Sequence, residues 1–315
     1  MAQESSPAAK TGSTLIPLIM LLIVGVVWGA IFTVNKAAAE AAVPPLAYAF
    51  WSIFIAGVAM AVLSLIFDGR PKLGPKYLLF YFISGVANFG FAIILFAYAA
   101  PKLPAGVITL VMMMTPTMTY LFTFVLRIDR FRTASFLGLI LGIIGVLVIV
   151  LPEFSLPTRE MAGWFLLVLL GPTSFAVGNV YVAVSRPPEM PGLMATAGLC
   201  LGAAVFILPV LLVVDGTSNP LTVSSEGAAT MVIAAAIYCI TLTFFFEIIR
   251  RAGPLFWSQI GYISVVSGIV WGIIVFGEQH SAGIWLGAAL MFGGLALVNS
   301  GVRAAAREES KAPAG

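Results

Sequence analysis

Ten apolar runs, each long enough to cross a lipid bilayer, dominate this sequence of 315 residues. A helix needs roughly 20 apolar residues to span the hydrocarbon core. The runs cover residues 15–35, 45–67, 77–99, 103–126, 134–151, 163–184, 193–214, 227–249, 254–276 and 282–300. Charged residues make up only 9% of the chain, against roughly 25% in a soluble domain. We therefore predict an all-α integral membrane protein with ten transmembrane helices.

The second half of the chain repeats the first. At an offset of 149 residues the aligned pairs are Asp129 with Glu278, Thr115 with Ser264, Leu137-Gly138 with Leu286-Gly287, and Gly145 with Gly294. Self-similarity at a fixed period indicates duplication of a structural unit. We expect two five-helix repeats, 15–151 and 163–301, joined by a linker at 152–162.

Basic residues are distributed unequally between the two sides of the predicted membrane. Three of the 16, Lys36, Lys102 and Arg159, fall on one side, and the other thirteen fall on the side of the termini. Because loops rich in Lys and Arg stay in the cytoplasm, both tails, 1–14 and 302–315, should be cytoplasmic, and the linker 152–162 periplasmic. The tails are polar and rich in small residues, which predicts disorder.

Charge and repeat together predict that the second copy is inverted. Five helices is an odd number, so the second copy enters the membrane from the opposite face. The turn that carries Arg70, Lys72 and Lys76 has a counterpart, 217–219, with no basic residue. The copies thus differ in basic residues as opposite orientations require.

Several kinds of chemistry are missing from the sequence. No Gly-rich loop ends in Gly-Lys-Ser/Thr, so ATP hydrolysis by a P-loop is not expected. No Cys/His spacing suggests a metal site, so we expect neither cofactor nor metal, no nucleic-acid partner and no enzyme. The only histidine, His280, is expected in a solvated external turn, with a pH-sensing role as the alternative.

Glu247 is the one ionisable residue well inside an apolar run, two residues from its end. An acid inside the membrane can couple transport to protons. However, Arg250 and Arg251 follow one helical turn later, at positions suited to an ion pair. Both interpretations stay open at the sequence level.

Two runs are interrupted near mid-depth, and these interruptions point to a binding site. Pro116 lies in the middle of 103–126, and Pro172 lies in the middle of 163–184. A proline frees a backbone carbonyl, which a polar ligand in an inverted-repeat transporter can use. A plain structural kink is the alternative for each. The candidate substrate-binding residues near this depth are Asn88, Met112, Thr115, Pro116, Pro172, Ser174, Asn179, Tyr238, Tyr262, Ser264 and Trp271.

The sequence resembles the drug/metabolite transporter superfamily, in particular its EamA-type members with ten helices in two repeats. The resemblance covers residues 15–301. It is carried by Trp28-Gly29, Ala105-Gly106, Pro116, Asp129, Leu137-Gly138 and Gly145-Val146, and in the second copy by Gly253-Pro254, Glu278, Leu286-Gly287 and Gly294. Two positions depart from the family pattern: Val265 stands where a second mid-helix proline would be, and Asp129 stands where glutamate is usual.

Within that superfamily the sequence is similar to bacterial exporters of aromatic and other amino acids. The resemblance implies efflux of small molecules across the bacterial inner membrane by alternating access, without ATP. Without a midplane acid, facilitated diffusion is the simpler expectation, and a proton-coupled drug or metabolite exporter of the same fold is the alternative. A non-transporting membrane scaffold is a third hypothesis. Besides substrate and lipid we expect no partner beyond a weak homo-oligomer.

Overall fold

The computed structural model describes residues 15–127, 132–150, 158–214, 223–252 and 260–309, and these ranges are helical with no strand. Eight helical stretches are long and apolar enough to cross a membrane, and two shorter apolar helices, Thr133–Ile149 and Ile260–Phe276, complete the set of ten. The ten-helix prediction is therefore confirmed. The predicted N-terminal tail, most of the linker, and Asp129 lie outside the described residues.

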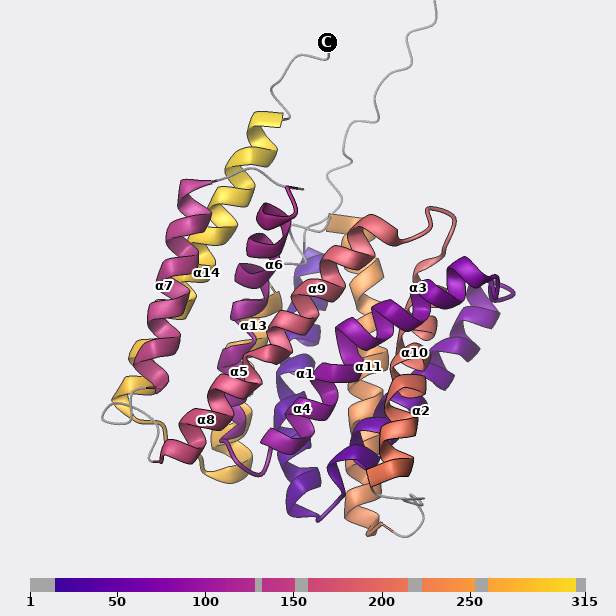
Figure 1. Cartoon of the computed structure of the whole chain (residues 1–315), viewed down its shortest axis with the longest axis horizontal. Coiled ribbons are helices and arrows are strands. Elements are labelled where there is room, and N and C mark those ends of the chain that lie inside the picture. The colour runs from indigo at the N-terminus through magenta and orange to yellow at the C-terminus, as the bar shows by residue number, and fades with distance from the viewer. Residues whose placement is uncertain (1–14, 128–131, 151–157, 215–222, 253–259, 310–315) are drawn as a thin grey trace, which may run out of the picture.

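Five spans form each half of the molecule (Figure 1). The first half contains α1 (Leu15–Glu40), α2 (Pro45–Phe67), a third span of α3 (Pro75–Gly85), η1 (Val86–Gly90) and α4 (Phe91–Ala99), a fourth of α5 (Ala105–Val111) and α6 (Met114–Val125), and α7 (Thr133–Val150). The second half contains a sixth span of α8 (Arg159–Val168) and α9 (Leu170–Ser185), then α10 (Gly192–Val214), α11 (Ser225–Ala252), α13 (Ile260–Phe276) and α14 (Ala282–Glu309).

Proline and glycine set several helix ends. Pro45 and Pro75 occupy the first turns of α2 and α3, where a missing N–H costs no hydrogen bond. Gly69 follows α2 with φ of 86°, and Gly277 follows α13 with φ of 62°. A left-handed residue after a helix favours glycine.

The prediction of a disordered C-terminal tail, 302–315, was wrong in part, because α14 continues to Glu309.

Three spans are interrupted. The fourth is broken at residues 112–113 and the sixth at Leu169, each a few residues before the proline that predicted the break. In the third span a π-helix, η1, separates α3 from α4, and no proline signals it. Its counterpart in the second half, α11, is a continuous α-helix. The counterpart of the sixth span, α1, is likewise a continuous α-helix. The two halves therefore differ at both of these spans.

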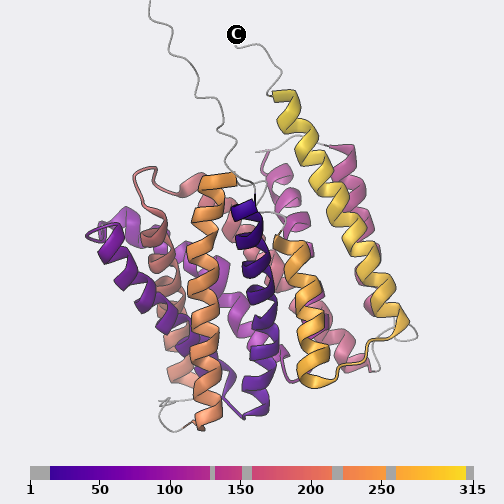
Figure 2. The same ribbon diagram turned by 180° about the vertical axis from the view of Figure 1, so that it is seen from behind.

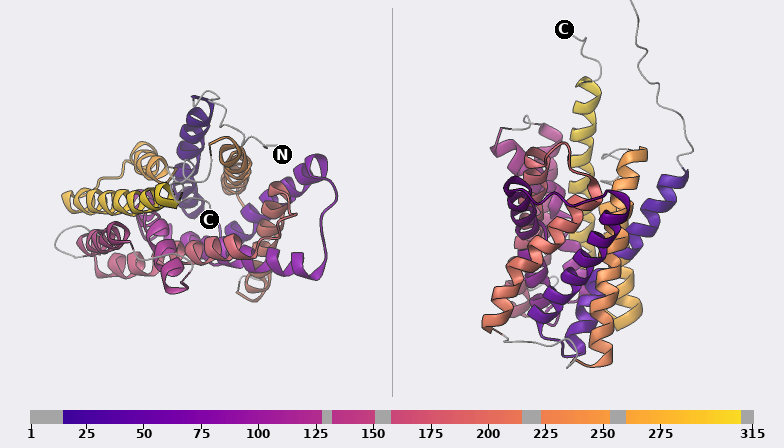
Figure 3. Two further views of the ribbon diagram at one scale, coloured as in Figure 1. Left: turned by 90° about the horizontal axis from the view of Figure 1, so that it is seen from above. Right: turned by 90° about the vertical axis from the view of Figure 1, so that its right-hand side faces the viewer.

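The two halves pack against each other with pseudo-twofold symmetry. α7 lies along α14, α2 lies along α10, and the packing of α1 on α13 is matched by that of α6 on α9. The first two contacts pair equivalent helices of the two halves, and the last two are images of each other when the halves are exchanged. Seen from above, the bundle is flattened, with α7 and α14 at one end and α2 and α3 at the other (Figure 3).

Four glycines show this symmetry at the atomic level. A Cβ added to Gly138 would lie 2.5 Å from the Gly294 carbonyl oxygen, and one added to Gly287 would lie 2.9 Å from the Gly145 carbonyl oxygen. Because Gly138 aligns with Gly287 and Gly145 aligns with Gly294, the two contacts are images of each other. Small residues let membrane helices approach this closely.

The halves run in opposite directions. α1 begins at the end of the bundle where α14 finishes, and α1 lies between α11 and α13 when the molecule is seen from behind (Figure 2). We call this the terminal end, and the other the distal end. The turn with Arg70, Lys72 and Lys76 lies at the terminal end, whereas Glu278 and His280 lie at the distal end.

Candidate functional site

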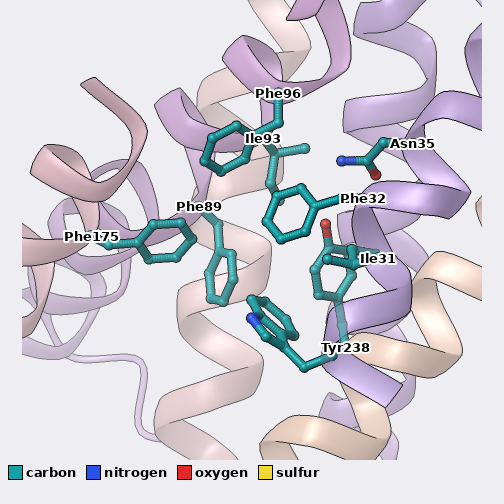
Figure 4. A pocket seen from close by; sticks show the side chains of 9 residues that line it. Ile31, Phe32, Asn35, Phe89, Ile93, Phe96, Phe175 and Tyr238 are labelled. Atoms are coloured by element: carbon teal, nitrogen blue, oxygen red, sulfur yellow. The ribbon is translucent and has the colours of Figure 1, made fainter. Parts of the chain in front are cut away.

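A small cavity at the centre of the bundle is enclosed by aromatic side chains from both halves (Figure 4). Its lining residues are Trp28, Ile31, Phe32, Asn35, Phe89, Ile93, Phe96, Phe175 and Tyr238. Its volume of about 10 Å³ is about what one water molecule needs. None of these described lining residues carries a carboxylate, amine or guanidinium group.

The rings interlock across the boundary between the halves. Phe89 on η1 packs edge-on against Phe175 on α9 at 5.7 Å and against Tyr238 on α11 at 5.9 Å. Trp28 on α1 lies 6.0 Å from Tyr238. Such edge-to-face arrangements are the favoured geometries of aromatic pairs. The rings fill the centre, so the structure shows a closed conformation of the cavity.

Asn35 supplies the one side-chain amide of the cavity wall. The Tyr48 hydroxyl donates a 2.6 Å hydrogen bond to Asn35 Oδ1, and both residues are buried. This bond orients the amide, whose nitrogen points toward the rings in Figure 4. Sequence reasoning missed Asn35, although Trp28, Phe32 and Asn35 follow helical steps of four and three and so share one face.

Tyr238 is the only candidate substrate-binding residue that lines this cavity. Asn88 belongs to η1, and Ser174 lies on α9, which packs against η1. Asn88 Nδ2 donates to the Ser84 carbonyl at 3.0 Å and lies against Gly178, where an added Cβ would be 2.3 Å away. Ser174 donates to the Ala87 carbonyl at 2.6 Å. Both side chains support the π-helix, a feature frequent at functional sites.

The candidate residues of the interrupted spans lie outside the cavity lining. In the fourth span, Met112 packs against the core, and Pro116 is half-buried. Thr115 Oγ1 is buried with no hydrogen-bond partner within the described part of the chain. In the sixth span, Pro172 is buried, and the Thr173 hydroxyl donates to the Leu169 carbonyl at 2.8 Å. A neighbouring hydroxyl thus satisfies one carbonyl at this break.

The remaining candidates serve other helix contacts. Ser264 donates to the Ile260 carbonyl within α13, and Trp271 Nε1 donates to the Val26 carbonyl of α1 at 3.1 Å. Tyr262 stacks on Phe292 of α14. Asn179 is exposed on α9. The structure therefore does not bring these four residues to the central cavity.

Glu247 forms an ion pair with Arg251 one turn later on α11. Its side chain is partly exposed, close to the end of the helix. The geometry matches the ion-pair interpretation of this residue.

The distal end holds a cluster of charged groups that the sequence did not predict. Glu278 accepts hydrogen bonds from Lys36 Nζ at 2.8 Å and from the backbone N–H groups of Ala105 at 2.7 Å and Gly106 at 3.1 Å. The carboxylate is only 4% exposed. Through these hydrogen bonds it caps the first turn of α5, where the helix dipole favours an anion, and links α1 to the turn before α14.

Two glycines make room for this carboxylate. A Cβ on Gly272 would lie 2.5 Å from Glu278 Oε2, and one on Gly106 would lie 2.9 Å from His280 Nε2. Backbone and carboxylate can approach only because both positions lack a side chain.

His280 is buried, which corrects the prediction of a solvated turn residue. Its side chain is 1% exposed, 3.7 Å from Glu278 Oε2, and packs edge-on against Trp285. Neither ring nitrogen has a hydrogen-bond partner among the described residues. Burial lowers the pKa of His280 below its ordinary value, the Glu278 carboxylate opposes that shift, and Lys36 adds to it.

Ten helices in two halves around a central cavity define a membrane transporter. Residues 15–151 and 162–300 each match the model of the EamA-like transporter family. The chain belongs to this family, and the sequence resemblance is confirmed. It is therefore a multi-pass membrane protein that transports a small molecule.

Two known proteins are similar to this chain over much of its length. Protein PecM of Dickeya dadantii is 24% identical over 274 residues, 86% of this chain and 88% of that protein. A probable amino-acid metabolite efflux pump of Salmonella typhimurium is 30% identical over 195 residues, 61% of this chain and 62% of that protein. One solved crystal structure aligns with a TM-score of 0.60 and 19% identity, covering 90% of this chain and 96% of its own, which supports the fold alone.

Proposed function

We propose that this protein exports neutral amino acids, aromatic ones among them, from the cytoplasm across the bacterial inner membrane. The observation that carries the proposal is the central cavity, with six aromatic rings, one oriented amide and no charged side chain among its described lining residues. Rings can stack on an apolar or aromatic substrate side chain. The printed name of the Salmonella relative, an amino-acid metabolite efflux pump, agrees with this class.

The charged ends of an amino acid need partners in such a cavity. The ammonium group can lie over an aromatic face. The Asn35 amide and backbone dipoles of the interrupted third, fourth and sixth spans can meet the carboxylate. These partners are not specific for one side chain, so we expect broad specificity.

Transport requires the cavity to open. An amino acid needs far more room than about 10 Å³, since ligand pockets measure roughly 300–1,000 Å³. We infer that substrate enters when the helices separate at the terminal end and leaves when they separate at the distal end. In the second step the contacts of Glu278 with α1 and α5 are the ones that must change.

The proposed energy source is the substrate gradient. No carboxylate lies among the described residues that line the cavity, and Glu247 is paired near a helix end. Proton-coupled export of a drug or metabolite is the competing function. It would use a carboxylate outside the cavity.

Counterflow in liposomes that contain only this protein tests the proposal. We expect uptake of labelled phenylalanine to be driven by unlabelled neutral amino acids and not by aspartate or lysine, without an imposed pH gradient. Tyr238→Ala should change the order of preferred substrates, because it removes a ring from the cavity, whereas Asn179→Ala, exposed on α9, should not. Flux that needs a pH gradient and disappears in Glu247→Gln would establish the proton-coupled function instead.

A further inference from the structure

A second, larger cavity lies away from the centre, between α2 and α3. It is a groove of about 430 Å³, with α10 as its floor and the turn after α2 at its terminal end. Its lining residues are Ala61, Ser64, Leu65, Pro71, Leu73, Leu78, Tyr81, Phe82, Met194, Ala197, Gly198, Leu201, Gly202 and Val205. Several of them, including Leu78 and Val205, are exposed, so the groove opens toward the membrane.

The packing of the three helices explains why the groove exists. α2 and α3 both pack on α10. α3 crosses α10 at backbone contact, since a Cβ on Gly85 would lie 2.4 Å from the Leu199 carbonyl oxygen and one on Gly202 would lie 2.3 Å from that of Tyr81. From this crossing α2 and α3 separate toward the turn that joins them (Figure 3). The groove lies in the space between them.

The groove has the length and polarity of an acyl-chain site. Its floor runs from Met194 to Val205, which is about 16 Å of helix, or roughly half of a 30 Å hydrocarbon core. Only Ser64 and Tyr81 bring side-chain polar atoms to it. The Ser64 hydroxyl donates to Asp68 and that of Tyr81 donates to the Lys72 carbonyl, so both are satisfied without a ligand.

The terminal end of the groove is cationic. Arg70 and Lys72 flank the lining residue Pro71, and the Arg70 side chain is exposed. Lys72 Nζ donates to the Glu189 carbonyl at 2.9 Å, and Lys76 pairs with the Glu189 carboxylate. Asp68 accepts a hydrogen bond from the Met194 backbone N–H. Arg186 donates to the Met190 carbonyl beside Glu189. The four cations Arg70, Lys72, Lys76 and Arg186 outnumber the acids Asp68 and Glu189, which favours an anionic headgroup.

From this juxtaposition we propose that the groove is a binding site for one acyl chain of an anionic phospholipid, whose phosphate is held at Arg70 and Lys72. The lipid belongs to the leaflet at the terminal end. Its chain fills the space between α2 and α3 and holds both against α10. The site is separate from the central cavity and does not depend on the identity of the transported substrate.

Thermal unfolding of the purified protein in detergent, with phosphatidylglycerol or phosphatidylcholine added, tests the headgroup. We expect phosphatidylglycerol to stabilise the protein more than phosphatidylcholine. Arg70→Gln and Lys72→Gln should each weaken phosphatidylglycerol binding about fivefold, as expected for one cation near an anionic headgroup. The control is Arg127→Gln, which removes an exposed cation elsewhere at the terminal end. This variant should bind phosphatidylglycerol as well as the unchanged protein does.

A second variant tests the groove itself. Val205→Trp should fill the end of the groove farther from Arg70 and Lys72 and reduce the lipid retained in native mass spectrometry. Val213→Trp, on the same helix, outside the groove and 85% exposed, should not. Equal stabilisation by the two lipids in all variants would overturn the headgroup assignment. Displacement of lipid by phenylalanine would assign the groove to substrate instead. A dimer that is lost in Val205→Trp while lipid binding stays unchanged would assign it to a second copy of the chain.

Discussion

At the scale of single residues, Glu278 joins three parts of the molecule. It binds the end of α1 through Lys36, caps α5 through two backbone N–H groups, and belongs to the turn between α13 and α14. A buried carboxylate needs such hydrogen-bond partners in place of water. Its hydrogen bonds therefore hold these helices together at the distal end in the closed conformation.

Replacing Glu278 with glutamine should lower the free energy of unfolding by about 1–3 kcal/mol, since Lys36 loses its charged acceptor and the amide NH2 of glutamine cannot accept from a backbone N–H group. Glu160→Gln is the matched control. Glu160 pairs with Lys102 at 3.2 Å, but both side chains are exposed, so its loss should cost less than about 1 kcal/mol. Denaturant unfolding in detergent measures both. Equal costs for the two variants would remove the structural role assigned to Glu278.

His280 predicts a pH dependence with a definite sign. Its pKa is lowered in the folded protein, so the unfolded chain, with an ordinary pKa of about 6.5, binds the proton first. Its contribution to stability is therefore present above about pH 6.5 and declines as the pH falls below that value. Between about pH 7.5 and about pH 5.5 the midpoint of thermal unfolding should fall further in the unchanged protein than in His280→Gln. An identical fall of the unfolding midpoint in both proteins would contradict the role of His280 in this pH dependence.

At the scale of elements, the contact between α7 and α14 depends on backbone approach at glycine. A Cβ on Gly294 would lie 2.7 Å from the Gly138 carbonyl oxygen and 2.8 Å from the Gly142 nitrogen. At the neighbouring Gly293 the nearest atom is the tip of the Leu141 side chain at 3.1 Å. The tip of the Leu141 side chain can move to make room for a methyl group at position 293. A methyl group at position 294 fits only if the backbones of α7 and α14 separate.

Gly294→Ala should therefore destabilise the protein by about 1–3 kcal/mol, the usual cost of overpacking. Gly293→Ala should be neutral or stabilising, because alanine favours a helix by up to about 1 kcal/mol over glycine. Thermal unfolding of the two variants in detergent makes the comparison. A stable Gly294→Ala protein would mean that the helices are less tightly packed than described.

The elements also show what the sequence could reveal. Span positions and the breaks near Pro116 and Pro172 depend on local hydropathy and on proline, and both were predicted. The face that each helix turns to the cavity was not, because these helices are apolar on all sides. Of the candidate site only Tyr238 lines the cavity. The Lys36–Glu278 pair joins positions 242 residues apart, and no local pattern indicates it.

At the scale of the whole molecule, the inverted repeat was readable because duplication leaves aligned residues and opposite loop charges. The asymmetric features were harder to predict. The π-helix η1 has no counterpart in α11, and Phe89, which it carries, packs on rings from the second half. The wall of the cavity therefore differs between the halves even though the helices around it are related.

The glycine contacts between α7 and α14 also set an order of events during synthesis. Gly145 enters the membrane 149 residues before Gly294, a delay of roughly 7–30 s at ordinary ribosome speed. Throughout that interval the part of the glycine face of α7 that packs on α14 lacks this partner. The nascent first half must stay inserted without its final neighbours, and the fold is completed only when the last helix leaves the translocon.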